Sequence, residues 1–197
     1  MTDLSQQKKE LRREYKARRA ELDKAQKERF DAIICDNIVS LDCFKAAHTL
    51  LTYAPIASEI DINPIAAEAL RLGKSVAYPV CDTDSSTLTF RYISDLSELV
   101  CGSYSIPEPP EYADIFRDNE SAICIVPALA IDKQGFRLGY GKGYYDRFLT
   151  NFSGIAISAL YSDFIANELP RDKYDIPIEL IVTERGNIII NAEKGKI

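Results

Sequence analysis

The residues with the clearest chemical potential lie in one segment, 125–149, which reads IVPALAIDKQGFRLGYGKGYYDRFL. Its glycines allow backbone N–H groups to approach phosphate oxygens without a Cβ in the way. The helix predicted to begin near Tyr144 adds free amides and a partial positive charge. Lys142 and Arg137 can supply full positive charge, and Asp146 can face a metal ion. The segment therefore predicts a loop that binds phosphate.

The glycine spacing departs from the two common nucleotide-binding fingerprints. A Walker loop has four residues between its first glycine and the Gly-Lys pair, whereas five separate Gly135 from Gly141. The pattern Gly-x-Gly-x-x-Gly fails too, because the run from Gly139 to Gly143 is Gly-x-Gly-x-Gly. A flexible turn whose tyrosines simply pack remains the alternative interpretation.

The elements that must position this loop follow from the spacing of apolar residues. A first helix is predicted at 4–22, and a second runs from Asp23, its N-cap, to Leu41. Further helices are predicted at 61–72, 94–99 and 143–151. Strands are predicted at 48–53, 75–79, 87–92, 121–126, 154–161, 179–183 and 187–190. Continuous apolar strands alternating with helices predict a three-layer α/β sandwich, a mainly parallel sheet covered by helices on both faces, with an N-terminal helical pair. Such sheets bind ligands at the carboxyl ends of their strands, where loops 54–60 and 127–146 fall. Residues 102–112 are expected to form an ordered loop.

Composition limits the classes of function. A chain of 197 residues, 46% apolar and 27% charged, predicts one domain, 1–197, with 1–41 as a helical extension packed on it. A net charge of −6 argues against broad attraction to nucleic acid or anionic membrane, although segment 8–19 carries seven basic and two acidic residues. The single histidine, His48, argues against a His-rich zinc site.

The sequence also bears on the cell compartment. Its five cysteines are scattered and odd in number, which favours a reducing environment. No signal peptide is evident, and no run reaches the ~18 apolar residues of a transmembrane helix. We therefore expect a cytoplasmic protein that binds neither membrane nor nucleic acid.

The run RLGYGKGYYDRFL, preceded by VPALAID and followed later by an Ile-Val-Thr-Glu strand, resembles the signature of the 5-formyltetrahydrofolate cyclo-ligase family. The basic first helix, YAPIASEID and SIPEP occur in that family's order, so the resemblance covers most of the chain. It implies a cyclo-ligase that uses ATP, with Mg²⁺, to convert 5-formyltetrahydrofolate to 5,10-methenyltetrahydrofolate, with release of ADP and phosphate, through a phosphorylated formyl intermediate. Its partners would be these small molecules, and we expect a monomer.

The resemblance also implies residue roles, by position in the family's motifs. The ATP-binding residues are Lys8, Lys9, Glu10, Leu11, Arg12, Arg137, Leu138, Gly139, Tyr140, Gly141, Lys142, Gly143, Tyr144 and Tyr145. The folate-binding residues are Ala54, Glu59, Tyr140, Gly141, Lys142, Gly143 and Tyr144. The catalytic residues are Lys8, Arg137 and Lys142, and the magnesium ligands are Asp146 and Asp175. The substitution Asp146→Asn is expected to lower turnover and to spare the fold.

The chain departs from the family's pattern at a few positions. Tyr140 and Lys142 occupy variable slots, and Ser105 stands where a glycine is common. Tyr174 and Glu179 replace a histidine and an aspartate often found near the last strand.

The same residues have plainer interpretations. Lys8 and Arg12 share a helix face that could simply be solvated, Glu59 could lie at the surface or cap a helix, and Asp175 could be a turn residue. Two other functions fit the charged pattern: a sugar-phosphate isomerase that needs no ATP, and a non-catalytic module whose basic helix binds RNA.

Overall fold

A seven-stranded sheet forms the centre of the computed structural model, which describes residues 3–56, 58–117 and 121–190. Its strands are β1 (Thr49–Leu51), β2 (Ser75–Asp82), β3 (Thr87–Ile93), β6 (Ala122–Ile125), β9 (Ile155–Ala159), β11 (Leu180–Thr183) and β12 (Gly186–Ile189). Their order across the sheet is β12-β11-β9-β6-β1-β2-β3. The five inner strands run parallel, and both edge strands are antiparallel to their neighbours.

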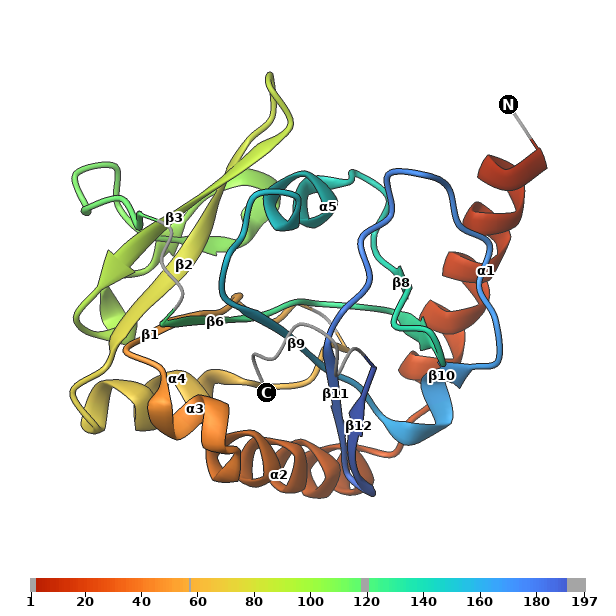
Figure 1. Cartoon of the computed structure of the whole chain (residues 1–197), viewed down its shortest axis with the longest axis horizontal. Helices are drawn as coiled ribbons and strands as arrows, with labels where there is room; N and C mark the ends of the chain where they lie inside the picture. The colour runs from red at the N-terminus through yellow and green to blue at the C-terminus, as the bar shows by residue number, and fades with distance from the viewer. Residues whose placement is uncertain (1–2, 57, 118–120, 191–197) are drawn as a thin grey trace.

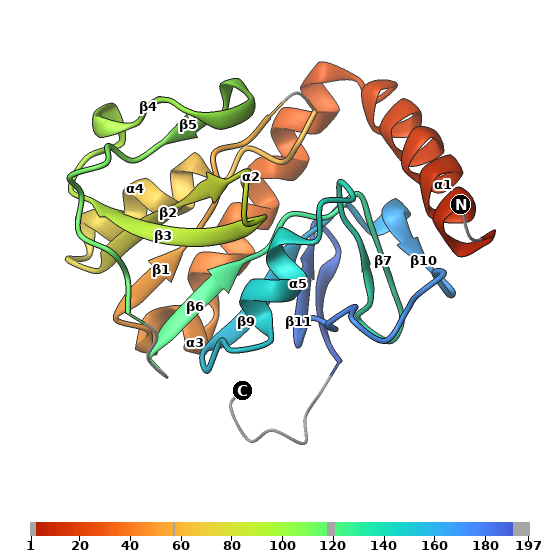
Figure 2. The same cartoon turned by 90° about the horizontal axis from the view of Figure 1, so that it is seen from above.

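Helices cover both faces of this sheet. They are α1 (Asp3–Ala20), α2 (Lys24–Ser40), α3 (Asp42–Ala46), α4 (Asn63–Arg71) and α5 (Tyr144–Leu149). Figure 1 shows α2, α3 and α4 along one face and α5 on the other, and Figure 2 gives the same arrangement from above. The predicted three-layer α/β sandwich is confirmed, and both N-terminal helices are present.

The two N-terminal helices take different positions. The second, α2, lies under the main sheet, while α1 stands at its edge beside a small second sheet (Figures 1 and 2). This sheet has the order β10-β7-β8 and consists of β7 (Ala130–Asp132), β8 (Arg137–Leu138) and β10 (Ile165–Ala166). A two-stranded ribbon, β4 (Val100–Cys101) and β5 (Pro107–Glu108), completes the strands of the described residues.

Alternation along the strands creates two apolar cores. Successive strand side chains point to opposite faces, so Leu50 and Val76 pack toward α2 and α4, whereas Leu51 and Ala77 pack toward α5. On the α5 side, the rings of Phe148 and Phe90 pack at a tilt of 50°, with centroids 4.7 Å apart. This packing fixes α5, and with it the end of the glycine-rich segment, against the sheet.

Several predicted elements need correction. The helix predicted at 94–99 is a single 3₁₀ turn, Leu96–Glu98, because a stretch this short gains too few helical hydrogen bonds to offset nucleation. The second helix begins at its predicted cap, Asp23, which accepts a hydrogen bond from the Gln26 amide at 3.1 Å. This helix ends at Ser40, because the backbone of the next residue, Leu41, is extended. The short helix α3, which was not predicted, follows.

The remaining differences concern element ends and one loop. The first and fourth helices are shorter than predicted, since α1 ends at Ala20 and α4 spans Asn63–Arg71. The segment 127–146, predicted as one long loop, contains the hairpin of β7 and β8. The predicted loop 54–60 includes residue 57, which lies outside the described residues. Within the described part, no helix combines the length and apolarity that a membrane crossing requires.

Candidate functional site

The glycine loop, residues 139–143, connects β8 to α5. Gly141 and Gly143 have φ angles of 101° and 69°, in the left-handed region that favours glycine. A Cβ on Gly141 would lie 2.9 Å from Arg12 Cζ, and one on Gly143 would lie 2.9 Å from Arg147 Nη1. A Cβ on Gly139 would meet nothing within 4 Å. Two glycines therefore set the loop's shape, and the third faces open space.

Arginines from both neighbouring helices hold the carbonyl groups of this loop. Arg12 Nε on α1 donates to Gly139 O at 2.9 Å, and Arg147 Nη2 on α5 donates to Lys142 O at 2.7 Å. Within the described residues, no hydrogen bond engages the amides of residues 139–143. Because α5 is only six residues long, these loop amides, more than the helix end, are the groups that can meet an anion.

The two carboxylates predicted as metal ligands are Asp146 on α5 and Asp175 in the loop that precedes β11. Asp146 Oδ1 accepts a hydrogen bond from the Ile176 amide at 3.2 Å and pairs with Arg137 Nη2 at 3.0 Å. Asp175, the residue before Ile176, pairs with Lys8 Nζ at 2.5 Å and accepts from the Asp172 amide at 2.8 Å. Asp175 thus links Lys8 of α1 to the loop whose next residue, Ile176, contacts both Arg137 and Asp146.

The donor set at this place fits Mg²⁺ rather than a metal with a full protein cage. Among the described residues, no three or more histidine, cysteine, aspartate or glutamate side chains are arranged around one metal position. Mg²⁺ is typically held by one or two carboxylates together with substrate phosphates and water. Asp146 and Asp175 can supply that pair beside the glycine loop.

Glu59 lies in a separate, buried part of the site. It is 5% exposed, and its Oε2 accepts a hydrogen bond from the Ile56 amide at 2.9 Å. Burial raises the pKa of Glu59, while the hydrogen bond from that amide and the charge of Arg19 act in the opposite direction. Ala54, also predicted to contact folate, is buried at the start of the same loop.

The other predicted residues differ in how they face this site. Lys9, Glu10 and Lys142 are exposed, Leu11 is partly buried against the core, and Leu138 is fully buried in it. The Tyr144 hydroxyl lies 3.4 Å from the Tyr104 hydroxyl. The Tyr145 hydroxyl is buried and has no hydrogen-bond partner among the described residues. The roles predicted for these side chains stay predictions.

Sequence reasoning missed three residues of the site. Arg19 is buried and donates from Nη2 to Ala128 O at 2.7 Å and to Leu129 O at 3.1 Å. Lys16 Nζ lies 5.0 Å from the centre of the Tyr140 ring. Arg147 ties the glycine loop to Ser86 O at 2.6 Å. Helical spacing could have indicated the first two, because residues 12, 16 and 19 fall on one face of α1.

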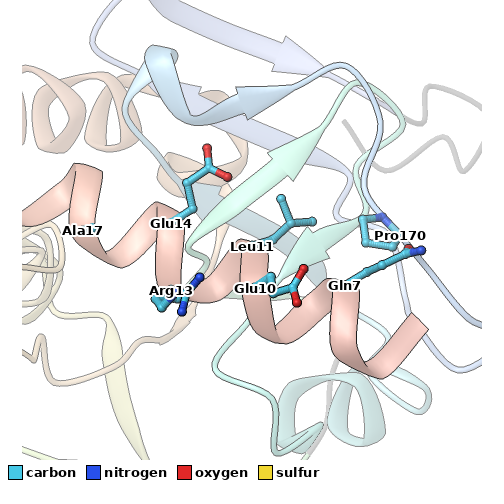
Figure 3. A pocket seen from close by; sticks show the side chains of 7 residues that line it. All are labelled: Gln7, Glu10, Leu11, Arg13, Glu14, Ala17 and Pro170. Atoms are coloured by element: carbon cyan, nitrogen blue, oxygen red, sulfur yellow. The ribbon is translucent and has the colours of Figure 1, made fainter. Parts of the chain in front are cut away.

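A groove of about 790 Å³ runs along another part of α1 (Figure 3). It is lined by Gln7, Glu10, Leu11, Arg13, Glu14, Ala17 and Pro170. The groove includes two residues predicted to bind ATP, Glu10 and Leu11, but none of the glycine loop. The glycine loop, Arg12 and Arg137 therefore lie outside it.

These features define an α/β protein with a candidate ligand site beside the carboxyl ends of β1 and β6, where Glu59 and the Arg19 contacts follow those strands. The family model of the 5-formyltetrahydrofolate cyclo-ligase family matches residues 4–184, and the chain belongs to that family of enzymes.

Known relatives agree with this assignment. The 5-formyltetrahydrofolate cyclo-ligase of Escherichia coli K12 is 32% identical over 142 residues, which cover 70% of this chain and 78% of the relative. The solved 5,10-methenyltetrahydrofolate synthetase of Aquifex aeolicus superposes with a TM-score of 0.82, at 31% identity and over 93% of each chain. The 5,10-methenyltetrahydrofolate synthetase of Mycoplasma pneumoniae shares the fold, with a TM-score of 0.73 at 24% identity over 90% of this chain and 98% of that one.

Proposed function

We propose that the protein uses ATP to cyclise 5-formyltetrahydrofolate to 5,10-methenyltetrahydrofolate, with release of ADP and phosphate. The observation that carries this proposal is the glycine loop, whose amides are unengaged within the described residues and whose carbonyl groups are held by Arg12 and Arg147. A row of free amides flanked by cations suits the β- and γ-phosphates of a nucleotide. Family membership favours this reaction over the sugar-phosphate isomerase and the RNA-binding module.

The chemical sequence begins with transfer of the γ-phosphoryl group of ATP to the formyl oxygen, which releases ADP. N10 of the folate then attacks the formyl carbon and loses its proton. Phosphate leaves with the former formyl oxygen, and the five-membered methenyl ring closes. No protein nucleophile is needed, so the residues act by positioning the two substrates and by balancing charge.

The charged residues divide this task. Lys8, Arg12 and Arg137 lie where they can offset the negative charge of the triphosphate. Asp146 and Asp175 would hold Mg²⁺, which supplies further charge neutralisation when bound. Glu59 offers a buried carboxylate to the N–H-rich edge of the pterin ring. This contact would orient the folate so that its formyl group faces the phosphates.

The direct test is to incubate the purified protein with 5-formyltetrahydrofolate and Mg·ATP and to follow methenyl-folate absorbance and ADP release together. Folate labelled with ¹⁸O in the formyl group tests the phosphorylated intermediate, because the label should appear in inorganic phosphate. Label found only in water would refute that step. Absence of both products, with turnover of a sugar phosphate in a nucleotide-free assay, would refute the whole proposal.

A pair of alanine substitutions tests the role of the loop. Gly139→Ala should leave the fold and thermal stability unchanged, because its Cβ meets nothing within 4 Å, yet it should weaken ATP binding if phosphates occupy that open space. Gly141→Ala is the comparison, and it should disturb the free protein because φ is 101° and Arg12 is in the way. Isothermal titration calorimetry with a non-hydrolysable ATP analogue measures the nucleotide affinity of both variants. Unchanged affinity in Gly139→Ala would place the phosphates elsewhere.

A further inference from the structure

The helix α2 carries a buried carboxylate that is bound from three separate parts of the chain. Asp31 is 6% exposed, on a helix face that otherwise buries apolar side chains. The Lys27 ammonium group lies 2.5 Å from its Oδ2, the Tyr161 hydroxyl donates to Oδ1 at 2.5 Å, and the Asp61 amide donates to Oδ2 at 3.0 Å. Asp31 therefore joins α2 to the segment after β9 and to the segment that precedes α4.

The backbone of Asp61 is held on both sides by α2. Its amide is bonded to Asp31, and its carbonyl oxygen accepts a hydrogen bond at 3.3 Å from Cys35 Sγ, one helical turn further along. Its own Oδ1 accepts from the Asn63 amide at 3.1 Å, where α4 begins. Glu59, the carboxylate proposed for the pterin, precedes Asp61 by two residues. The bonds to Asp61 therefore limit the positions that the buried Glu59 can take.

The ion pair between Lys27 and Asp31 contributes little to the stability of the fold. The two side chains are 23% and 8% exposed, and the cost of removing their charges from water roughly offsets their attraction. An apolar side chain at position 31 would pack against the core without this cost, but it would leave the Asp61 amide and the Tyr161 hydroxyl without their acceptor. The effect that an acceptor at position 31 provides is therefore the orientation of the groups that it binds.

We propose that Asp31 is a positioning residue for the folate end of the site: by accepting the Asp61 amide, it holds the end of loop 54–60 so that Glu59 presents its carboxylate to the pterin. This inference rests on the proposed function, since it takes Glu59 to bind the folate. The three donors to Asp31 all lie outside the glycine loop. The residue should therefore affect the binding of the folate and not that of ATP.

Two substitutions at position 31 separate positioning from stability. Both Asp31→Leu and Asp31→Asn remove the charge beside Lys27, so both should destabilise the fold. Asparagine keeps a carbonyl oxygen for the Asp61 amide, whereas leucine has no acceptor. Asp31→Leu should raise the KM for the folate about five- to tenfold, with kcat and the KM for ATP little changed, because the binding conformation of the loop is then less populated. Asp31→Asn should keep the folate KM within about twofold of wild type.

The control is Asn37→Ala on the same helix. Asn37 Nδ2 donates to Thr183 O at 2.9 Å, so this side chain ties α2 to β11 instead of to the segment after Glu59. Its loss should lower the free energy of unfolding and leave both KM values unchanged. If Asp31→Leu does not fold, Cys35→Ala takes its place, because it releases only the carbonyl oxygen of residue 61. The folate KM of that variant should rise about two- to threefold.

Hydrogen exchange in the ligand-free protein gives a readout that needs no substrate. The Asp61 amide should exchange at least about tenfold faster in Asp31→Leu than in wild type, and at nearly the wild-type rate in Asp31→Asn. An unmoved exchange rate, an unchanged folate KM, an equal rise in the KM values for folate and ATP, or a raised folate KM in Asn37→Ala would each overturn the inference. If the wild type neither binds nor cyclises the folate, the proposed function fails, while the exchange rate still decides whether Asp31 holds the Asp61 backbone.

Discussion

Replacing Asp146 with asparagine should destabilise the protein, even before ATP or metal is present. Arg137 Nη2 lies 3.0 Å from Asp146 Oδ1, and the side chains are 4% and 24% exposed. Removing one partner of a fully buried ion pair costs about 3–5 kcal/mol. Here the carboxylate is partly exposed, Arg137 keeps its bond to Ile176 O at 3.0 Å, and asparagine can still accept from the Ile176 amide. We therefore expect a loss of about 2 kcal/mol, the value of a hydrogen bond to a charged group.

Urea unfolding without Mg²⁺ or nucleotide measures this loss apart from any metal effect. A chain of this size should also melt about 4–8 °C lower. The control is Asp172→Asn: that carboxylate is 43% exposed and 3.7 Å from Lys8 Nζ, so it should change stability by less than about 0.5 kcal/mol. Wild-type stability in Asp146→Asn would refute the reasoning and restore the sequence-based expectation that this substitution spares the fold.

Two further predictions concern backbone strain and pH. Ser105 has a φ of 59°, a conformation that costs a non-glycine residue about 1–2 kcal/mol. Ser105→Gly removes this strain but gives the unfolded chain more conformational freedom, so we expect a net stabilisation of about 0.5–1 kcal/mol. Ser105→Ala keeps the strain and should show no gain in the same urea titration. Burial raises the pKa of Glu59 above 4.5, so its contribution to stability is full below pH 4.5 and is lost as pH rises through the raised pKa. The free energy of unfolding of wild type minus that of Glu59→Gln should therefore fall as pH rises above 4.5, and a difference that does not vary with pH would contradict this.

The strands of the main sheet could be predicted because burial on both faces leaves continuous apolar runs. β1 and β6 are buried at every position, and each falls inside a predicted strand. The small sheet could not be predicted in this way. β7 pairs with β10, in the register Ile131 to Ile165 and Ala166 to Asp132, and strands of two or three residues leave no periodic pattern to recognise.

The candidate site was predictable in its residue types but not in its pairings. The glycine loop, Glu59 and the two aspartates follow from motifs and from the family resemblance. The partners of Arg137 and Lys8 do not, because Asp146 reaches Arg137 from α5 and Asp175 reaches Lys8 from a turn, and contacts between such separate segments have no short sequence signature. At Ser105 the sequence did point to a structural feature. This serine stands where the family commonly has a glycine, and it takes the left-handed backbone conformation that glycine adopts without strain.

The charge of α1 acquires a specific meaning once these pairings are known. Seven basic residues on an acidic chain could indicate a surface for a polyanion such as RNA. However, Lys8 is bound to Asp175, Arg12 to Gly139 O, and Arg19 to two carbonyl oxygens beyond β6. These cations already join α1 to the loop that contains Asp175, to the glycine loop and to the segment that follows β6. A triphosphate at the glycine loop would therefore share cations with acceptors of the protein itself, and its arrival would loosen the bond between Lys8 and Asp175 just where that carboxylate is proposed to bind Mg²⁺. On this account, nucleotide and metal should bind with positive cooperativity, because each releases the charged partner that the other requires.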